Sequence, residues 1–123
     1  MPFIDPAGLP RLELFPGASA GLAAGERLML SFLELAPGAE IPEHSHPHEQ
    51  AGLILAGRLR FRIGMEERVA GPGEAFLIPP DTVHWGIVEE GPVKVLDLFS
   101  PPREDYLERY NRFTAISDRT VWG

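Results

Sequence analysis

Apolar and polar residues alternate over short stretches of this chain, and turn residues separate the stretches. In residues 58–63, Leu59, Phe61 and Ile63 alternate with arginines, which is the period of a strand with one face turned inward. Short strands with frequent turn signals are typical of an all-β sandwich or barrel. The predicted strands lie near residues 11–15, 28–35, 40–46, 50–56, 58–63, 75–79, 83–88 and 93–99.

Glycine and proline mark the predicted turns, and one helix is expected after them. Gly57 is predicted to end one strand and open the next, and the dipeptide at 72–73 is a strong turn signal. After Pro101 and Pro102 the apolar period becomes helical, which predicts one short C-terminal helix at about 103–113.

Length and composition are those of one globular domain. The chain has 123 residues, of which 44% are hydrophobic and 24% charged, with no repeat and no long linker. We therefore expect a single domain over residues 1–123.

Cysteine and charge exclude several classes of site. The chain has no cysteine, so thiolate zinc sites and iron–sulfur clusters are excluded. Its net charge is −7 and no basic stripe is visible, which argues against nucleic-acid binding. No apolar run reaches the length of a membrane span, and the N-terminal residues do not resemble a signal peptide. We expect a cytoplasmic protein.

Candidate metal-binding side chains are concentrated in residues 43–50, EHSHPHEQ, which contain three of the chain's four histidines. His44 and His46 can share one face of an extended strand, and Pro47 is expected to interrupt that strand. His84 alone is more typical of a satisfied polar residue. A histidine cluster in a chain without cysteine, however, indicates a metal site, because imidazole is the commonest metal ligand.

Two stretches of the chain resemble the paired motifs of the cupin family. Residues 38–57 carry the pattern Gly-x5-His-x-His-x3-Gln-x6-Gly, with Gln50 where the family usually has Glu. Residues 73–88 carry Gly-x5-Pro-x-Asp-x2-His, and depart from the family at Asp81 and Val88. The resemblance implies a jelly-roll (double-stranded β-helix) barrel with one divalent metal at its mouth. The ligands it implies are His44, His46, Gln50 and His84.

An amide in place of a carboxylate leaves the metal with more of its positive charge, which makes it a better Lewis acid and disfavours its oxidation.

Two residues next to the motif positions are alternative ligands. Glu49 is one residue off the motif and would point to the opposite face of the strand. His48 has the same parity as His44 and His46, and is interpreted as a residue of the pocket rim.

A second group of residues narrows the resemblance. Asp97 lies among apolar residues on the predicted inward face of 93–99, and Phe99 and Arg103 follow it. This Asp-x-Phe-x3-Arg set, together with Gln50, resembles the KdgF-type pectin-degradation cupins. This resemblance implies that Asp97 moves protons, that Arg103 pairs with the substrate carboxylate and that Phe99 packs on the sugar ring.

The resemblance implies an isomerase that converts 4,5-unsaturated uronate monosaccharides to linear keto sugar acids, and a homodimer. Two alternatives stay open from the residues alone: another metallocupin enzyme, such as an iron- or manganese-dependent dioxygenase, and a non-catalytic sugar-binding cupin. Imidazole and amide donors suit Zn, Ni, Fe and Mn alike, so the sequence leaves the metal unnamed.

Overall fold

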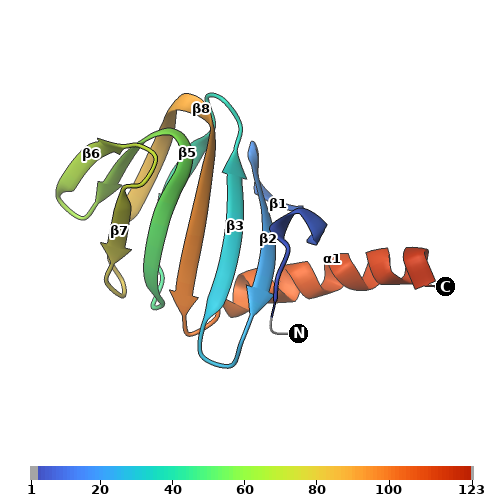
Figure 1. Ribbon diagram of the computed structural model, residues 1–123. Coiled ribbons are helices and arrows are strands. Elements are labelled where there is room, and N and C mark those ends of the chain that lie inside the picture. Colours follow the sequence, from blue (N-terminus) through green and yellow to red (C-terminus); the bar gives the residue numbers. More distant parts are fainter. Residues whose placement is uncertain (1–2, 123) are drawn as a thin grey trace.

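A computed structural model describes residues 3–122, which form eight strands, one short 3-10 turn and one α-helix (Figure 1). The elements are η1 (Pro6–Gly8), β1 (Leu12–Phe15), β2 (Ala18–Ala24), β3 (Met29–Leu35), β4 (Glu40–His44), β5 (Glu49–Ile63), β6 (Glu66–Ala70), β7 (Ala75–Ile78), β8 (His84–Ser100) and α1 (Glu104–Trp122). The predicted all-β barrel with a C-terminal helix is confirmed.

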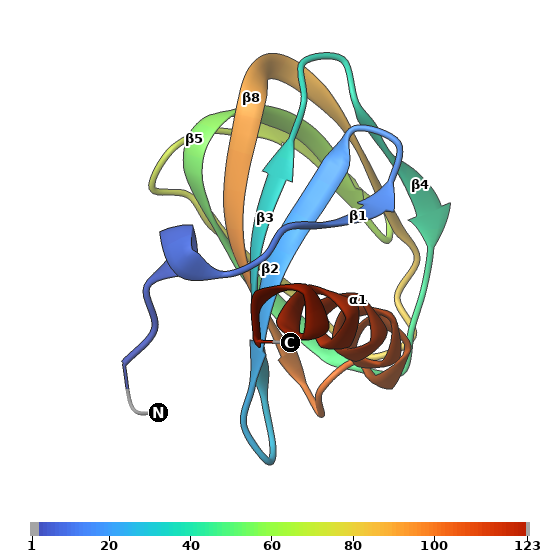
Figure 2. The same ribbon diagram turned by 90° about the vertical axis from the view of Figure 1, so that its right-hand side faces the viewer.

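Two long strands, β5 and β8, organise the barrel. They pair antiparallel along nearly their whole length, from Glu49 opposite Ser100 to Ile63 opposite His84. The first half of β5 and the second half of β8 lie in one layer with β7, β3, β2 and β1. Their other halves lie in a second layer with β4 and β6. The sheet therefore folds over on itself and encloses a core between the layers (Figure 2).

Gly57 bends β5 rather than ending it, so the prediction of separate strands at 50–56 and 58–63 is wrong. Its φ is +80°, and an added Cβ would lie 2.5 Å from the carbonyl oxygen of Pro92 on β8. Only glycine fits such an approach. The strands predicted at 83–88 and 93–99 likewise form one strand, β8, whose pairing with β5 continues across the bend.

Two strands that the sequence pattern did not predict complete the sheet. β2 reads ASAGLAA and β6 reads EERVA, and both are poor in the β-branched and aromatic residues that mark strands. β2 forms because it pairs with β3 in register over seven positions. β4 is shorter than predicted: it ends at His44, so His46 lies in the loop before β5.

Alternation along the strands builds the core. Positions of β3 alternate between buried and half-buried from Met29 to Leu35. On β8, Val93, Val95, Asp97 and Phe99 all face inward, as the sequence pattern predicts. Asp97 is therefore a carboxyl group inside the barrel.

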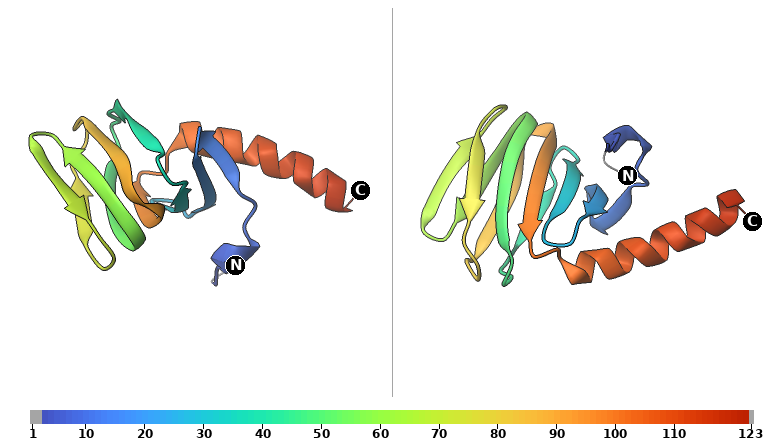
Figure 3. Two further views of the ribbon diagram at one scale, coloured as in Figure 1. Left: turned by 90° about the horizontal axis from the view of Figure 1, so that it is seen from above. Right: turned by 60° about the horizontal axis from the view of Figure 1, so that its bottom comes forward.

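The helix α1 is longer than the predicted 103–113, because no glycine or proline interrupts residues 114–122. Arg109 donates hydrogen bonds to the carbonyl oxygens of Glu13 and Leu14, and the Tyr110 hydroxyl donates to that of Pro10. These bonds hold the first half of α1 against β1, and the second half projects beyond the barrel (Figure 3). Within residues 3–122, no helix is both long and apolar enough to cross a membrane.

Candidate metal centre

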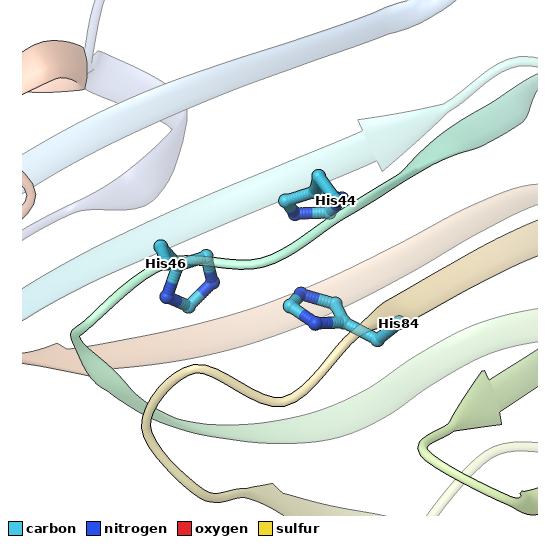
Figure 4. A group of neighbouring side chains, drawn as sticks. All are labelled: His44, His46 and His84. Atoms are coloured by element: carbon cyan, nitrogen blue, oxygen red, sulfur yellow. The ribbon is translucent and has the colours of Figure 1, made fainter.

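Three histidines meet at one mouth of the barrel (Figure 4). His44 at the end of β4 lies opposite His84 at the start of β8, and their ring centroids are 4.1 Å apart. His46 follows in the loop, with its ring centroid 5.0 Å from that of His84. One ring nitrogen from each of the three residues lies within 4.8 Å of the others.

Backbone carbonyls fix the orientation of all three rings. Nδ1 of His44 lies 2.7 Å from the carbonyl oxygen of Pro42, and Nδ1 of His84 lies 2.8 Å from that of Thr82. Nδ1 of His46 lies 3.1 Å from the carbonyl oxygen of His48. A carbonyl only accepts, so each Nδ1 carries the proton and each Nε2 keeps its lone pair. Such hydrogen bonds typically orient histidines that bind metals.

The lone pairs face one another, which fits a cation. Nε2 of His46 lies 3.0 Å from Oε1 of Gln50, and both atoms are acceptors in this arrangement. Two ligands about 2.1 Å from one ion and at right angles lie about 3.0 Å apart. Nε2 of His84 is buried and has no hydrogen-bond partner among the described residues. The four donors therefore fit a divalent metal ion. Imidazole nitrogens and an amide oxygen bind several divalent metals, so the donor types do not identify the metal.

Burial keeps the three imidazoles neutral. It lowers the pKa of His84 to about 4, against the opposing effect of its bond to Thr82. It also lowers the pKa of His44 and of His46. Neutral imidazole is the form that binds metal, so the site is ready for a cation at neutral pH.

Asp97 connects the histidine cluster to the interior. Nε2 of Gln50 donates to Oδ1 of Asp97 over 3.1 Å, which turns the amide oxygen of Gln50 toward His46. Asp97 is 4% exposed, and burial raises the pKa of its carboxyl to about 7, although the Gln50 bond and the charge of Arg103 oppose the rise. A carboxyl group with such a pKa can give and take protons near neutrality.

Arg103 lies over the same pocket, just before α1. It is 7% exposed, and its guanidinium carbon lies 3.6 Å from the centroid of the Tyr106 ring and 5.3 Å from that of Phe99. Its Nε and Nη2 donate to the two carboxylate oxygens of Asp105 over 3.2 and 2.8 Å. The arginine is thus fixed in place by a partner that sequence analysis did not identify.

One pocket brings most of these groups together. It is lined by His44, His84, Gln50, Asp97, Phe99 and Arg103, and also by Ser31 and Tyr106. The predicted site residues are therefore brought together, although they come from three separate stretches of the chain, at 44–50, 84 and 97–103. Ser31 was not among the predicted residues. Its signal in the sequence is a single polar residue on the inward face of an apolar strand.

The two alternative ligands lie outside the histidine cluster. His48 is buried, but its Nε2 lies 3.0 Å from Oε2 of Glu104 on α1. Glu49 is exposed on the outer face of β5. Neither side chain belongs to the group of donors around His84.

Known proteins share both the sequence pattern and the fold. The family described as "Cupin domain" matches residues 31–99, which contain the four candidate ligands and Asp97. The pectin degradation protein KdgF of Dickeya dadantii is 36% identical over 83 residues, which cover 65% of this chain and 74% of that protein. The solved structure of KdgF from Halomonas sp. has a TM-score of 0.79 and 30% identity, and the alignment covers 85% of this chain and 96% of that one.

Plant germin-like proteins are similar over a shorter region. Germin-like protein 3-8 of Oryza sativa subsp. japonica is 35% identical over 80 residues, or 59% of this chain, but the chain spans only 33% of that protein. With the Cupin domain match over more than half its length and the fold of KdgF around its histidines, this chain belongs to the cupin family.

Proposed function

We propose that this protein binds one divalent metal ion and converts 4,5-unsaturated uronate monosaccharides to linear keto sugar acids. The observation that carries the proposal is the buried carboxyl of Asp97, which shares one pocket with the histidine cluster and with Arg103. The similarity to KdgF, described as a pectin degradation protein, supports a uronate substrate. The acidic chain would otherwise repel an anion, so Arg103 supplies the local positive charge that such a substrate needs.

The reaction is an isomerisation with two proton transfers. The hydroxyl at C1 loses its proton and becomes a carbonyl as the bond between C1 and the ring oxygen breaks. The ring oxygen keeps the electron pair and becomes the oxygen of an enolate at C5. The enolate then becomes a ketone as C4 gains a proton, so the proton lost from the C1 hydroxyl is balanced by the one gained at C4 and nothing is oxidised.

Asp97 is suited to both transfers. Its ionised form accepts the proton from the C1 hydroxyl, and its protonated form delivers a proton to C4. Gln50 holds one carboxylate oxygen, Oδ1, at 3.1 Å, which leaves Oδ2 for the substrate. The surrounding Val95 and Phe99 are buried, so they keep competing water away from the carboxyl.

Arg103 is suited to bind the substrate carboxylate. Asp105 occupies Nε and Nη2 of the guanidinium, so Nη1 and the second hydrogen of Nη2 remain to donate. The rings of Tyr106 and Phe99 both lie near the guanidinium and give the sugar ring an apolar wall. The substrate carboxylate would thus be anchored beside Asp97.

Nε2 of His44, His46 and His84 and Oε1 of Gln50 would hold the metal. When bound, the metal supplies Lewis-acid polarisation of a substrate oxygen.

The experiment is to incubate the metal-loaded protein with unsaturated uronate monomers. Their conjugated enol-acid absorbance should decay faster than it does spontaneously, and Asp97→Asn should return it to the spontaneous rate. No acceleration with any epimer would refute the proposal. Iron-dependent oxygen uptake would indicate an oxygenase instead, and binding without turnover would indicate a sugar-acid binding protein.

We also propose that the protein forms a homodimer through the outer face of its larger layer. Two rows of apolar side chains cross β7, β5, β8 and β3 on that face. Cross-strand pairing puts Leu77, Ala51, Leu98 and Leu30 in one row and Ala75, Leu53, Leu96 and Phe32 in the other. A sheet that is apolar on both faces is typically covered on both. Glu34 and Lys94 lie opposite each other beside the second row, so two copies related by a twofold axis can pair these charges.

Light scattering on a sizing column tests the dimer. Leu77, which is 73% exposed, should give a monomer when it is changed to Glu. Met65 is 89% exposed in the β5–β6 turn, away from this face, so Met65→Glu should leave the dimer intact. A parent protein that is still monomeric at about 100 μM would refute the interface.

A further inference from the structure

The inward face of β3 carries one hydroxyl among apolar side chains. Met29, Leu33 and Leu35 fill the neighbouring inward positions, and Ser31 is 2% exposed between them. Burying a hydroxyl without a hydrogen bond is unfavourable, whereas alanine would fill the same position without that penalty. The serine therefore calls for a partner.

Ser31 lies next to the candidate proton-transfer residue. It is the cross-strand partner of Asp97 on β8, so the two side chains leave the sheet on the same face. Cβ atoms of such partners lie about 5 Å apart. Both residues line the pocket that contains Gln50 and His84.

No protein group in the described part of the pocket engages the Ser31 hydroxyl. The side-chain hydrogen bonds found there join Gln50 to His46 and Asp97, and Arg103 to Asp105. The Gln50 bond takes one oxygen of Asp97 from the side of β5. The hydroxyl on β3 is thus free to meet a ligand from the opposite side of the carboxyl.

We infer that Ser31 determines specificity in this pocket by binding a hydroxyl group of the sugar acid beside Asp97. The inference rests on the proposed function and adds the recognition of the sugar's neutral part. The other polar groups of the pocket are already assigned. The imidazoles and Gln50 are suited to bind a metal, Asp97 to transfer a proton and Arg103 to bind a carboxylate. A serine hydroxyl both donates and accepts, as a sugar hydroxyl does. A pocket built to bind a hydroxyl discriminates against analogues that lack it.

Substrate analogues separate recognition from packing. With Ser31→Ala, kcat/KM for the unsaturated uronate should fall about tenfold, mainly through KM, as expected for one lost hydrogen bond of about 1.4 kcal/mol. With the analogue that lacks the contacted hydroxyl, tested as the 2-deoxy and 3-deoxy compounds, the variant and the parent protein should be equal. The affinity for a saturated, non-reacting uronate, measured by calorimetry, should fall by the same factor.

The control is Ser19→Ala on β2, whose hydroxyl accepts a hydrogen bond from Arg11 away from the pocket. It should leave all of these constants unchanged. An unchanged kcat/KM in Ser31→Ala, or an equal loss with every analogue, would overturn the inference while the proposed function stands. A parent protein inactive toward all the uronates would overturn the proposed function, and this inference with it.

Discussion

Replacing Asp97 by Asn should stabilise the metal-free protein while it abolishes turnover. Burial raises the pKa of this carboxyl from an ordinary 3.8 to about 7 in the folded protein. Between these values the unfolded chain releases the proton and the folded protein retains it, so the free energy of unfolding falls as pH rises. Because one pKa unit is worth about 1.4 kcal/mol, the loss approaches about 4 kcal/mol above pH 7.

Asparagine removes this dependence but keeps an acceptor for Gln50. The lowered pKa values of the three histidines act in the opposite direction, since stability is lost as pH falls below about 6.5. They are common to both proteins, so the difference between variant and parent isolates Asp97. That difference should grow from about pH 4 and level off above about pH 7.

Urea unfolding of chelator-treated protein across this range, followed by circular dichroism, measures the difference. A second measurement, the metal content after reloading, should be equal in both proteins, because Asp97 is not among the four candidate ligands. A difference in stability that does not change with pH would refute the reasoning, as would normal turnover by the variant.

Three further substitutions test the site and the fold. His84→Ala should weaken metal binding more than about 100-fold, as measured by competition with a chelating dye. His48→Ala should leave the affinity unchanged, because His48 lies outside the cluster, and equal losses in the two variants would contradict the ligand set. Gly57→Ala should lower the free energy of unfolding by at least about 2 kcal/mol more than Gly73→Ala does. Both glycines have a positive φ, but only at position 57 would an added Cβ collide with backbone atoms. Thermal melts that show equal losses for the two variants would argue against this close approach. Arg103→Lys should raise KM for a uronate about tenfold with metal content unchanged, and an unchanged KM would remove it as the carboxylate anchor.

Local patterns were sufficient to predict much of the barrel, whereas the composition of the site was implied by the resemblance to the cupin motifs. Alternation predicted the inward face of β8, and with it the buried carboxyl at Asp97. The three clustered histidines indicated a metal site, whereas His84 joined the ligand set only through the resemblance to the cupin motifs. His46 reaches the cluster from the loop after β4 and not from the strand itself. β2 and β6 escaped prediction because their residues favour strands only weakly and pair through their neighbours.

Contacts between distant segments account for what the sequence did not reveal. The bond from Gln50 to Asp97 joins residues 47 positions apart, and it depends on the register between β5 and β8. The pair of Arg103 and Asp105 is an exception, because the two residues are only two positions apart and their contact is local. Ser31 acquires a functional neighbour only through the register of β3 with β8.

The shared strands β5 and β8 also determine how this barrel opens. Each strand runs through both layers, so neither layer can separate without breaking the ladder that holds the other. Amide hydrogens on the two layers should therefore exchange with solvent by the same global unfolding event, at matching rates along both halves of each strand. The short strands at the rim, β1 and β6, pair with a single neighbour and are free to fray earlier.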